Sequence, residues 1–296
     1  MKHRVTPAAH SMSFDEIAAS RTREAATARI ESLTTVFQRF GAGDRCGVGN
    51  AWTREHYGGD FELMNPPDGR TAVSLVFVQS RDGNTVAADP AALGGGDTDK
   101  HLIYEGLSRV AADAVLAGAG SVYRTAFFSV WHPDLVALRH QLGLPRHPAQ
   151  VVISQRGHLD DDALLFNVAD APVFLIAGND VISARAAWLR ARPWIHTIPL
   201  VADDLPSVFD CLRVSHGIRR MSAIGGRVTA SRLVDAGVVQ DLYLTTTARN
   251  GGELGTPWYS GAHHPRLELL TKKRWTDMGS VLAFEHFRLT DHMLPS

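Results

Sequence analysis

The sequence predicts an α/β protein in which a largely parallel sheet is covered by helices on both faces. From Thr71 onward, short apolar runs alternate with segments of helical periodicity. Near-continuously apolar strands separated by helices are typical of a parallel sheet that is buried on both faces. The end of the chain differs, because residues 267–274 and 280–289 flank a Thr-Asp-Met-Gly turn with no helix between them. This second pattern predicts an antiparallel hairpin that finishes the sheet.

The first 70 residues are predicted to form a helical N-terminal arm and a linker. Residues 13–16 have the spacing of a capping box, which marks the start of a helix. Apolar residues at helical intervals extend this helix to Phe37, before Gly41 and Gly43 stop the pattern. The next stretch is rich in Gly, Asp, Asn and Pro and ends in the turn sequence Asn-Pro-Pro-Asp-Gly at 65–69. The main domain is therefore placed at residues 71–296.

Strands and helices alternate within this main domain. Asp97 is the expected cap of its first helix, because an aspartate side chain accepts hydrogen bonds from the first free N–H groups of a helix. The predicted helices lie at 98–111, 183–192, 205–216 and 228–236. The predicted strands lie at 72–80, 114–118, 151–154, 173–177, 195–200, 221–224 and 241–247.

The composition excludes several classes of protein. Of the 296 residues 45% are apolar, and 30 Lys and Arg stand against 31 Asp and Glu. We therefore expect neither a fibre, a disordered chain nor a nucleic-acid-binding protein, which would carry an excess of basic charge. Cys46 and Cys211 lack the spacing of metal ligands, so free thiols and no metal site are expected. No signal peptide or membrane span is visible, which favours a cytoplasmic protein with no membrane partner.

Two glycine-rich loops follow predicted strands, at the positions where open α/β sheets bind ligands. Gly118 and Gly120 follow one strand, and Gly225 and Gly226 join another strand to a helix. A side chain at these positions would keep backbone amides away from a phosphate, and a helix N-terminus favours anions. Each pair alone is also compatible with a tight structural turn, because a complete dinucleotide fingerprint and a Walker sequence are both absent. Two such loops in one sheet favour a nucleotide cofactor.

A third loop, with the sequence Ser-Arg-Asp-Gly at 80–83, ends the first strand. Asp-Gly is a common turn signal, yet its place at the carboxyl end of a strand makes Asp82 a candidate site residue. The chain resembles the riboflavin-biosynthesis reductase family. The resemblance rests on this loop, residues 107–122, residues 151–154 and the glycines at 225–226, which occur in the family's order. The family forms the reductase half of the bifunctional pyrimidine deaminase-reductase.

The resemblance implies a dihydrofolate-reductase-like fold and NADPH as the cofactor. It implies reduction of a ribosylamino-pyrimidine, 5-amino-6-(5-phosphoribosylamino)uracil in the family, and a homodimer. Arg109 matches a substrate-binding arginine, and Asp82 is the candidate catalytic residue, which would orient the substrate or a proton-donating water. Ser154 and Arg156 match the loop that approaches the adenosine 2′-phosphate. The positions that match cofactor-binding residues are Val78, Gly118, Gly120, Ser121, Val122, Ser154, Arg156, Gly225, Gly226, Arg227 and Val228.

The sequence also departs from the family pattern. Arg81 stands where an apolar residue is usual, and Ile224 stands where the family has a substrate-binding glutamate. Ile-Gly-Gly at 224–226 followed by Asp-Leu-Tyr-Leu-Thr at 241–245 looks like the corresponding piece of dihydrofolate reductase itself. Two alternatives therefore stay open, a pteridine reductase of the dihydrofolate reductase type and a non-catalytic nucleotide-binding homologue. A zinc deaminase is excluded, because the chain lacks both an H-x-E segment and a paired-cysteine ligand motif.

Overall fold

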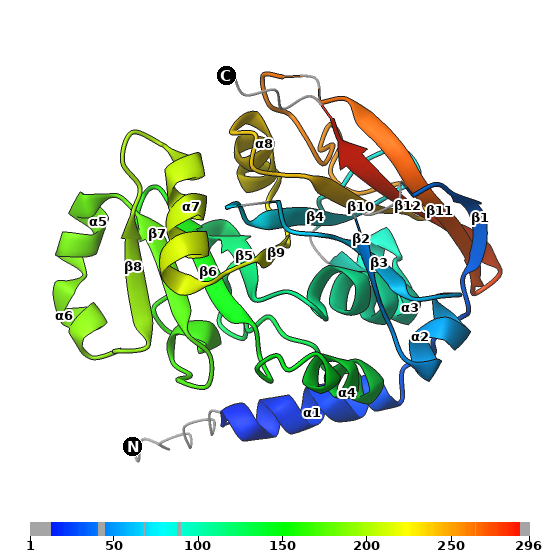
Figure 1. The fold of residues 1–296 in the computed structure, drawn as a ribbon, viewed down its shortest axis with the longest axis horizontal. Helices are drawn as coiled ribbons and strands as arrows, with labels where there is room; N and C mark the ends of the chain where they lie inside the picture. The colour runs from blue at the N-terminus through cyan, green and yellow to red at the C-terminus, as the bar shows by residue number, and fades with distance from the viewer. Residues whose placement is uncertain (1–12, 41–44, 68, 88–89, 264, 291–296) are drawn as a thin grey trace, which may run out of the picture.

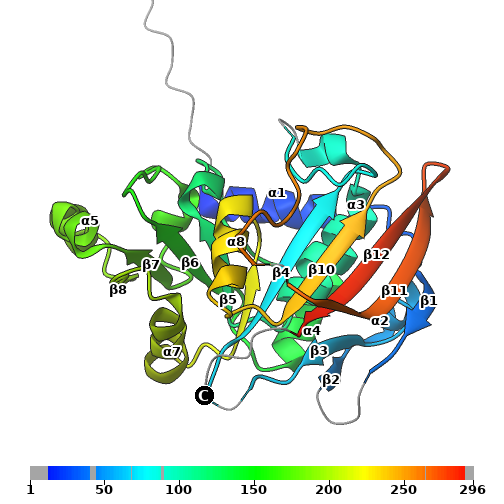
Figure 2. The ribbon, with the colours of Figure 1, turned by 90° about the horizontal axis from the view of Figure 1, so that it is seen from above.

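A ten-stranded sheet runs across the part of the chain that this computed structural model describes, residues 13–40, 45–67, 69–87, 90–263 and 265–290. Figure 2 shows its strands fanned across the molecule from β8 to β1. The strands, in spatial order, are β1 (Thr34–Gln38), β11 (Leu267–Asp277), β12 (Ser280–Leu289), β10 (Asp241–Thr246), β4 (Ala72–Gln79), β9 (Arg220–Ala223), β5 (Ala114–Gly118), β6 (Ala149–Ser154), β7 (Val173–Ala177) and β8 (Ile195–Pro199).

The sheet is parallel in its larger part and antiparallel at one side. All strand pairs from β10 to β8 are parallel. Strands β1, β11 and β12 add antiparallel pairs, and β12 joins them to β10. The predicted α/β class, the largely parallel sheet and the final hairpin are therefore confirmed, although the hairpin turns at Met278 and Gly279 rather than over four residues.

Helices cover both faces of the parallel strands. Alternate residues of β5 show this arrangement, because Leu116 belongs to one hydrophobic core and Val115 to another on the opposite face. Figure 1 shows α8 above the central strands and α1 and α4 below them. The helices are α1 (Phe14–Ala26), α2 (Ala51–His56), α3 (Gly96–Thr98), α4 (Pro133–Gln141), α5 (Asn179–Ala184), α6 (Ala186–Arg190), α7 (Leu205–His216) and α8 (Arg227–Asp235).

Shorter helical segments complete the fold. The helix predicted at 98–111 begins as α3 and continues as the π-helix η2 (Asp99–Leu107). The expected cap is wrong, because Gly95 occupies the N-cap position and Asp97 instead accepts a hydrogen bond from the backbone N–H of Arg29, at 3.2 Å. Three single turns of 3₁₀ helix are η1 (Pro90–Leu93), η3 (Ala119–Ser121) and η4 (Leu164–Phe166).

The N-terminal region differs from its prediction in several elements. The capping box at Ser13 is confirmed, but the helix ends at Ala26, so its predicted extension to Phe37 is wrong. Residues 34–38 form strand β1 instead, because the β-branched run Thr-Thr-Val suits a strand and pairs with β11. Gly41, Gly43 and Asp68 of the predicted turns lie outside the described residues.

The stretch interpreted as a linker holds further elements. A hairpin of β2 (Arg45–Val48) and β3 (Phe61–Met64) encloses α2 and packs into the same core as η2 and α4. The division of the chain into an arm and a main domain at residue 70 stays a prediction.

Candidate functional site

The carboxyl ends of β4, β9, β5 and β6 lie at one edge of the sheet, because these neighbouring strands are parallel. The loops that leave β5 and β9 meet there. Gly118 lies so close to the hydroxyl of Thr229 in α8 that a Cβ atom at this glycine would overlap it. The backbone N–H of Ile224, just after β9, donates to the carbonyl of Leu116 in β5 at 3.0 Å. The structure thus brings the two predicted glycine loops together.

Gly226 is the point at which the second loop becomes helix α8. Its φ is +79°, a conformation that L side chains rarely adopt, and a Cβ atom there would lie 3.2 Å from the hydroxyl of Ser121 in the first loop. As the N-cap residue, Gly226 supplies no side-chain hydrogen bond to the first turn of α8. The free N–H groups of a helix N-terminus attract an anion, so the loops present a phosphate-binding geometry.

The remaining glycines of the two loops border open space. A Cβ atom at Gly120 or Gly225 would meet no heavy atom within 4 Å. Val228 is 67% exposed, Val122 is buried, and Arg227 donates to the carbonyl of Gly255 at 3.0 Å. Val228 is therefore open to solvent and Val122 is part of the core, and the role of these residues in cofactor binding stays a prediction.

Val78 near the end of β4 lies beside a carboxyl group that the sequence patterns did not single out. Val78 pairs with Thr245 of β10, and the Thr245 hydroxyl donates a hydrogen bond to Asp99 at the start of η2. Burial raises the pKa of Asp99 to about 6, against the opposing effect of that hydrogen bond. A carboxyl group that titrates near neutral pH at the carboxyl edge of a sheet is a candidate acid or orienting group.

Asp82 lies in the exposed turn after β4. Its carboxylate accepts a hydrogen bond from the backbone N–H of Gly251 at 3.2 Å. The Ser80 hydroxyl and this N–H hold the pKa of Asp82 below its usual range. Asp82 is therefore ionised near neutral pH and suited to orienting a group rather than to donating a proton, whereas Asp99 is suited to both.

Ser154 and Arg156 lie at the same edge of the sheet, at the end of the next strand, β6. Ser154 ends β6 and is buried, while Arg156 is exposed two residues later. An exposed guanidinium beside a strand end fits a phosphate group, because its N–H groups match the geometry of the phosphate oxygens.

Arg109 lies apart from these residues. It follows η2 at the end away from Asp99, and its side chain is buried. Its guanidinium donates to the carbonyl of Ser129 at 3.0 Å and stacks on the ring of Tyr104 at 3.9 Å. No described contact joins Arg109 to Asp82 or to the glycine loops, so its substrate-binding role stays a prediction and its contacts are those of a packing residue.

The site residues fit a nucleotide cofactor on the evidence of the loops. Glycines leave room for a close approach, and the uncapped start of α8 offers N–H donors. Across the described ranges, no group of three His, Cys, Asp or Glu side chains is placed to hold a metal ion. Within those ranges no helix has the length and apolar character needed to cross a membrane.

The sheet order, the antiparallel C-terminal strands and the loop cluster define a dihydrofolate-reductase-like α/β protein. The chain belongs to the RibD C-terminal domain family, whose model matches residues 71–283. The similar solved structures include riboflavin-pathway reductases and a pyrimidine reductase-like protein. The recognition of this family from its sequence segments is confirmed.

Solved structures of low identity share the fold. A pyrimidine reductase-like protein of Corynebacterium diphtheriae is 18% identical with a TM-score of 0.61, over 74% of this chain and 92% of that one. The riboflavin biosynthesis reductase Rib7 of Saccharomyces cerevisiae is 18% identical with a TM-score of 0.52, over 75% and 91%. A deaminase/reductase of Thermotoga maritima is 16% identical with a TM-score of 0.53, over 75% of this chain but 58% of its own length. None of the curated proteins matches the chain.

Proposed function

We propose that the protein is an NADPH-dependent reductase of a ribosylamino-pyrimidine, as the riboflavin-pathway reductases are. The observation that carries this proposal is the meeting of two glycine loops at the uncapped N-terminus of α8, within a chain of the RibD C-terminal domain family. A nicotinamide cofactor supplies a hydride to an electrophilic carbon when it is bound. The protein holds the cofactor and the substrate in the orientation that hydride transfer needs, and it excludes water.

The residues at the carboxyl edge of the sheet have different roles in this function. Gly120 and Gly225 leave the backbone free to approach the pyrophosphate, and Gly118 and Gly226 let the two loops pack closely against Thr229 and Ser121. The first N–H groups of α8 would then face the pyrophosphate. The other predicted cofactor positions surround these glycines: Val78, Ser121, Val122, Arg227 and Val228 beside the loops, and Ser154 and Arg156 toward the 2′-phosphate.

Asp99 is the residue that we assign to the substrate side. Its carboxyl group, hydrogen-bonded to Thr245, lies next to the end of β4 and holds a proton over part of the neutral pH range. It is placed to orient a ring N–H group or to supply a proton through one water. Asp82 keeps the role of an ionised orienting group in the adjoining turn.

A pteridine reductase is the second candidate, and the residue that favours it is Ile224. An apolar side chain before Gly225 removes the carboxylate with which the family holds its pyrimidine substrate. Asp99 then becomes the carboxyl group available to an aminopyrimidine ring, which pteridines also contain. A non-catalytic nucleotide-binding protein is the third possibility.

One assay separates the three candidates. Oxidation of NADPH is followed by absorbance with 5-amino-6-(5-phosphoribosylamino)uracil, with dihydrofolate and with no acceptor. Turnover with the pyrimidine supports the proposal, and turnover with dihydrofolate alone supports the second candidate. NADPH binding without turnover on either acceptor identifies a binding protein. The proposal also includes a homodimer and a cytoplasmic location, for which sedimentation velocity and cell fractionation are the measurements.

A further inference from the structure

A second polar site lies at the opposite edge of the sheet. A cavity of about 30 Å³ opens between the first residues of β4, β9 and β10, beneath the hairpin strand β3 and beside the end of η2. Because these strands are parallel, this amino-terminal edge lies one strand length away from the glycine loops. Apolar side chains from β3 and η2, among them Leu63 and Leu107, form much of its wall.

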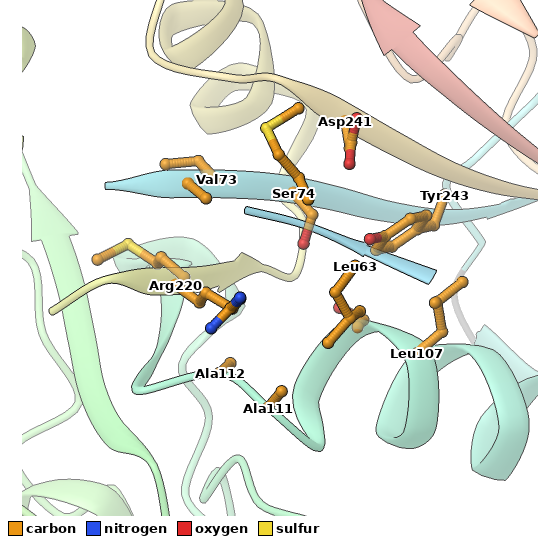
Figure 3. Close-up of a pocket in the computed structure, with 13 residues that line it drawn as sticks. Leu63, Val73, Ser74, Leu107, Ala111, Ala112, Arg220, Asp241 and Tyr243 are labelled. Atoms are coloured by element: carbon orange, nitrogen blue, oxygen red, sulfur yellow. The ribbon is translucent and has the colours of Figure 1, made fainter. Parts of the chain in front are cut away.

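Three polar side chains point into this cavity without a matching partner. Figure 3 shows the hydroxyl groups of Ser74 and Tyr243 and the guanidinium of Arg220 turned toward the same space. Tyr243 is 3% exposed, and among the described residues neither its hydroxyl nor that of Ser74 has a hydrogen-bond partner. The buried Nε of Arg220 is also unpartnered, although its Nη2 donates to Sγ of Cys46 at 3.3 Å. A buried N–H group is normally hydrogen-bonded, so the Nε of Arg220, with the two hydroxyl groups beside it, is suited to a bound polar ligand.

The charge of the cavity wall favours an anion. The guanidinium of Arg220 forms no ion pair in the described part of the chain, although the backbone N–H of Arg220 donates to the carboxylate of Asp113 at 2.8 Å. Asp241 is already held on both oxygens, by Arg45 at 3.3 Å and by His286 at 3.2 Å. Burial lowers the pKa of His286, which keeps its ring neutral near pH 7. Arg45 already compensates the charge of Asp241, so among the lining residues the guanidinium of Arg220 is the charged group left without an ion pair.

We propose that this cavity binds a small oxyanion, inorganic phosphate or a short carboxylate, held by Arg220, Tyr243 and Ser74. A guanidinium donates two parallel hydrogen bonds to such a group, and hydroxyl groups donate to its remaining oxygens. The bound anion also supplies Arg220 with the negative partner that it lacks. The cavity holds about two water-sized groups, so a formate fits within it and a phosphate would extend toward its open side.

The test is calorimetric titration of the full chain with inorganic phosphate and, in a separate arm, with formate, each at constant ionic strength set with chloride. Arg220→Gln is expected to weaken the binding at least tenfold, and Tyr243→Phe several-fold, because the latter removes a single hydroxyl. Arg274→Gln, which alters an exposed arginine on β11, is the matched control and is expected to change nothing. The arm that binds more tightly identifies the class of oxyanion.

Phosphate also fits the glycine loops, so the two sites must be separated. Gly226→Asp places a carboxylate at those loops and leaves the cavity unchanged. Phosphate or formate binding that survives Gly226→Asp and is lost in Arg220→Gln supports the proposal, whatever the cofactor proves to be. Binding that is lost in Gly226→Asp and kept in Arg220→Gln overturns it, as does the absence of binding of both anions. Circular dichroism checks folding, and Ser74→Ala with Tyr243→Phe replaces Arg220→Gln if that variant unfolds.

Discussion

Gly226 illustrates how much a single backbone position contributes to the proposed cofactor site. Its positive φ and its closeness to Ser121 are two separate constraints, one on conformation and one on space. An alanine there violates both without adding charge, and we expect it to lower the free energy of unfolding by about 1–3 kcal/mol. An aspartate adds a negative charge where the phosphate would lie.

The two variants of Gly226 separate backbone strain from charge repulsion. Gly226→Ala and Gly226→Asp are expected to lose similar thermal stability, while NADPH affinity falls far more for the aspartate. Fluorescence titration with NADPH measures the affinity, and urea unfolding measures the stability. A folded Gly226→Asp protein that binds NADPH normally would show that the second glycine loop is structural, and would leave the Gly118 loop as the remaining phosphate site.

The titration of Asp99 makes the stability of the protein depend on pH. Its folded pKa of about 6 lies above the ordinary 3.8, so the folded state holds the proton more tightly than the unfolded state does. The associated stability is present in full below about pH 3.8 and is lost as the pH rises through about 6. The shift corresponds to about 3 kcal/mol, at about 1.36 kcal/mol per pKa unit.

Asp99→Asn removes this titration and keeps a similar shape. We expect the variant to be more stable than the wild type at pH 8 and no more stable at pH 3.5, with kcat reduced at least tenfold. Urea unfolding across this pH range measures the first effect and steady-state kinetics the second. Asp170→Asn, in an exposed turn, is the matched control. An unchanged pH profile of stability in Asp99→Asn would contradict the assignment.

At the scale of elements, the hairpin of β2 and β3 is joined to the main sheet by a buried ion pair. Arg45 on β2 and Asp241 on β10 are almost fully buried, with Nη2 and Oδ1 3.3 Å apart. Removing one partner of a buried pair leaves the other charge uncompensated. We expect Arg45→Ala to lower the free energy of unfolding by about 3–5 kcal/mol, as measured by urea denaturation.

An exposed ion pair supplies the control. Arg29 and Glu31 lie 2.6 Å apart, but the Arg29 side chain is 84% exposed. We expect Arg29→Ala to change stability by less than about 1 kcal/mol. Equal effects in the two variants would show that the hairpin is held by its apolar contacts with the core and that the buried pair adds little.

Elements were predictable where the pattern is local. Strands β5 and β7 and helix α7 match their predicted bounds, because local apolar patterns mark them. Strand β1 was not predictable, since all five of its residues are exposed and its partner β11 lies more than 200 residues further along the chain. The glycines of the site were visible for the same local reason. Asp99 was not, because its raised pKa depends on burial beside Thr245 on a distant strand.

At the scale of the whole molecule, the two edges of the sheet carry different chemistry. The carboxyl edge gathers glycine loops and the start of α8, and the amino edge gathers buried guanidinium groups. The proposed cofactor would contact the loops after β5, β9 and β6, strands whose alternate side chains contribute to the cores on both faces of the sheet. Its binding is therefore expected to stabilise the entire fold, since a ligand that binds the native state alone stabilises it by mass action.

This linkage between ligand binding and stability distinguishes NADPH from NADH. At a concentration 100 times its dissociation constant, NADPH is expected to raise the free energy of unfolding by about 2.7 kcal/mol. NADH at the same concentration is expected to do less, because it lacks the 2′-phosphate that we propose Ser154 and Arg156 bind. A charge-assisted hydrogen bond to that phosphate contributes about 1.5–3 kcal/mol.

Arg156→Gln should therefore reduce the effect of NADPH to that of NADH while leaving the NADH effect unchanged. Scanning calorimetry measures the stability of the wild type and of Arg156→Gln, each with NADPH and with NADH. Equal stabilisation of the wild type by both cofactors would remove Arg156 from the site.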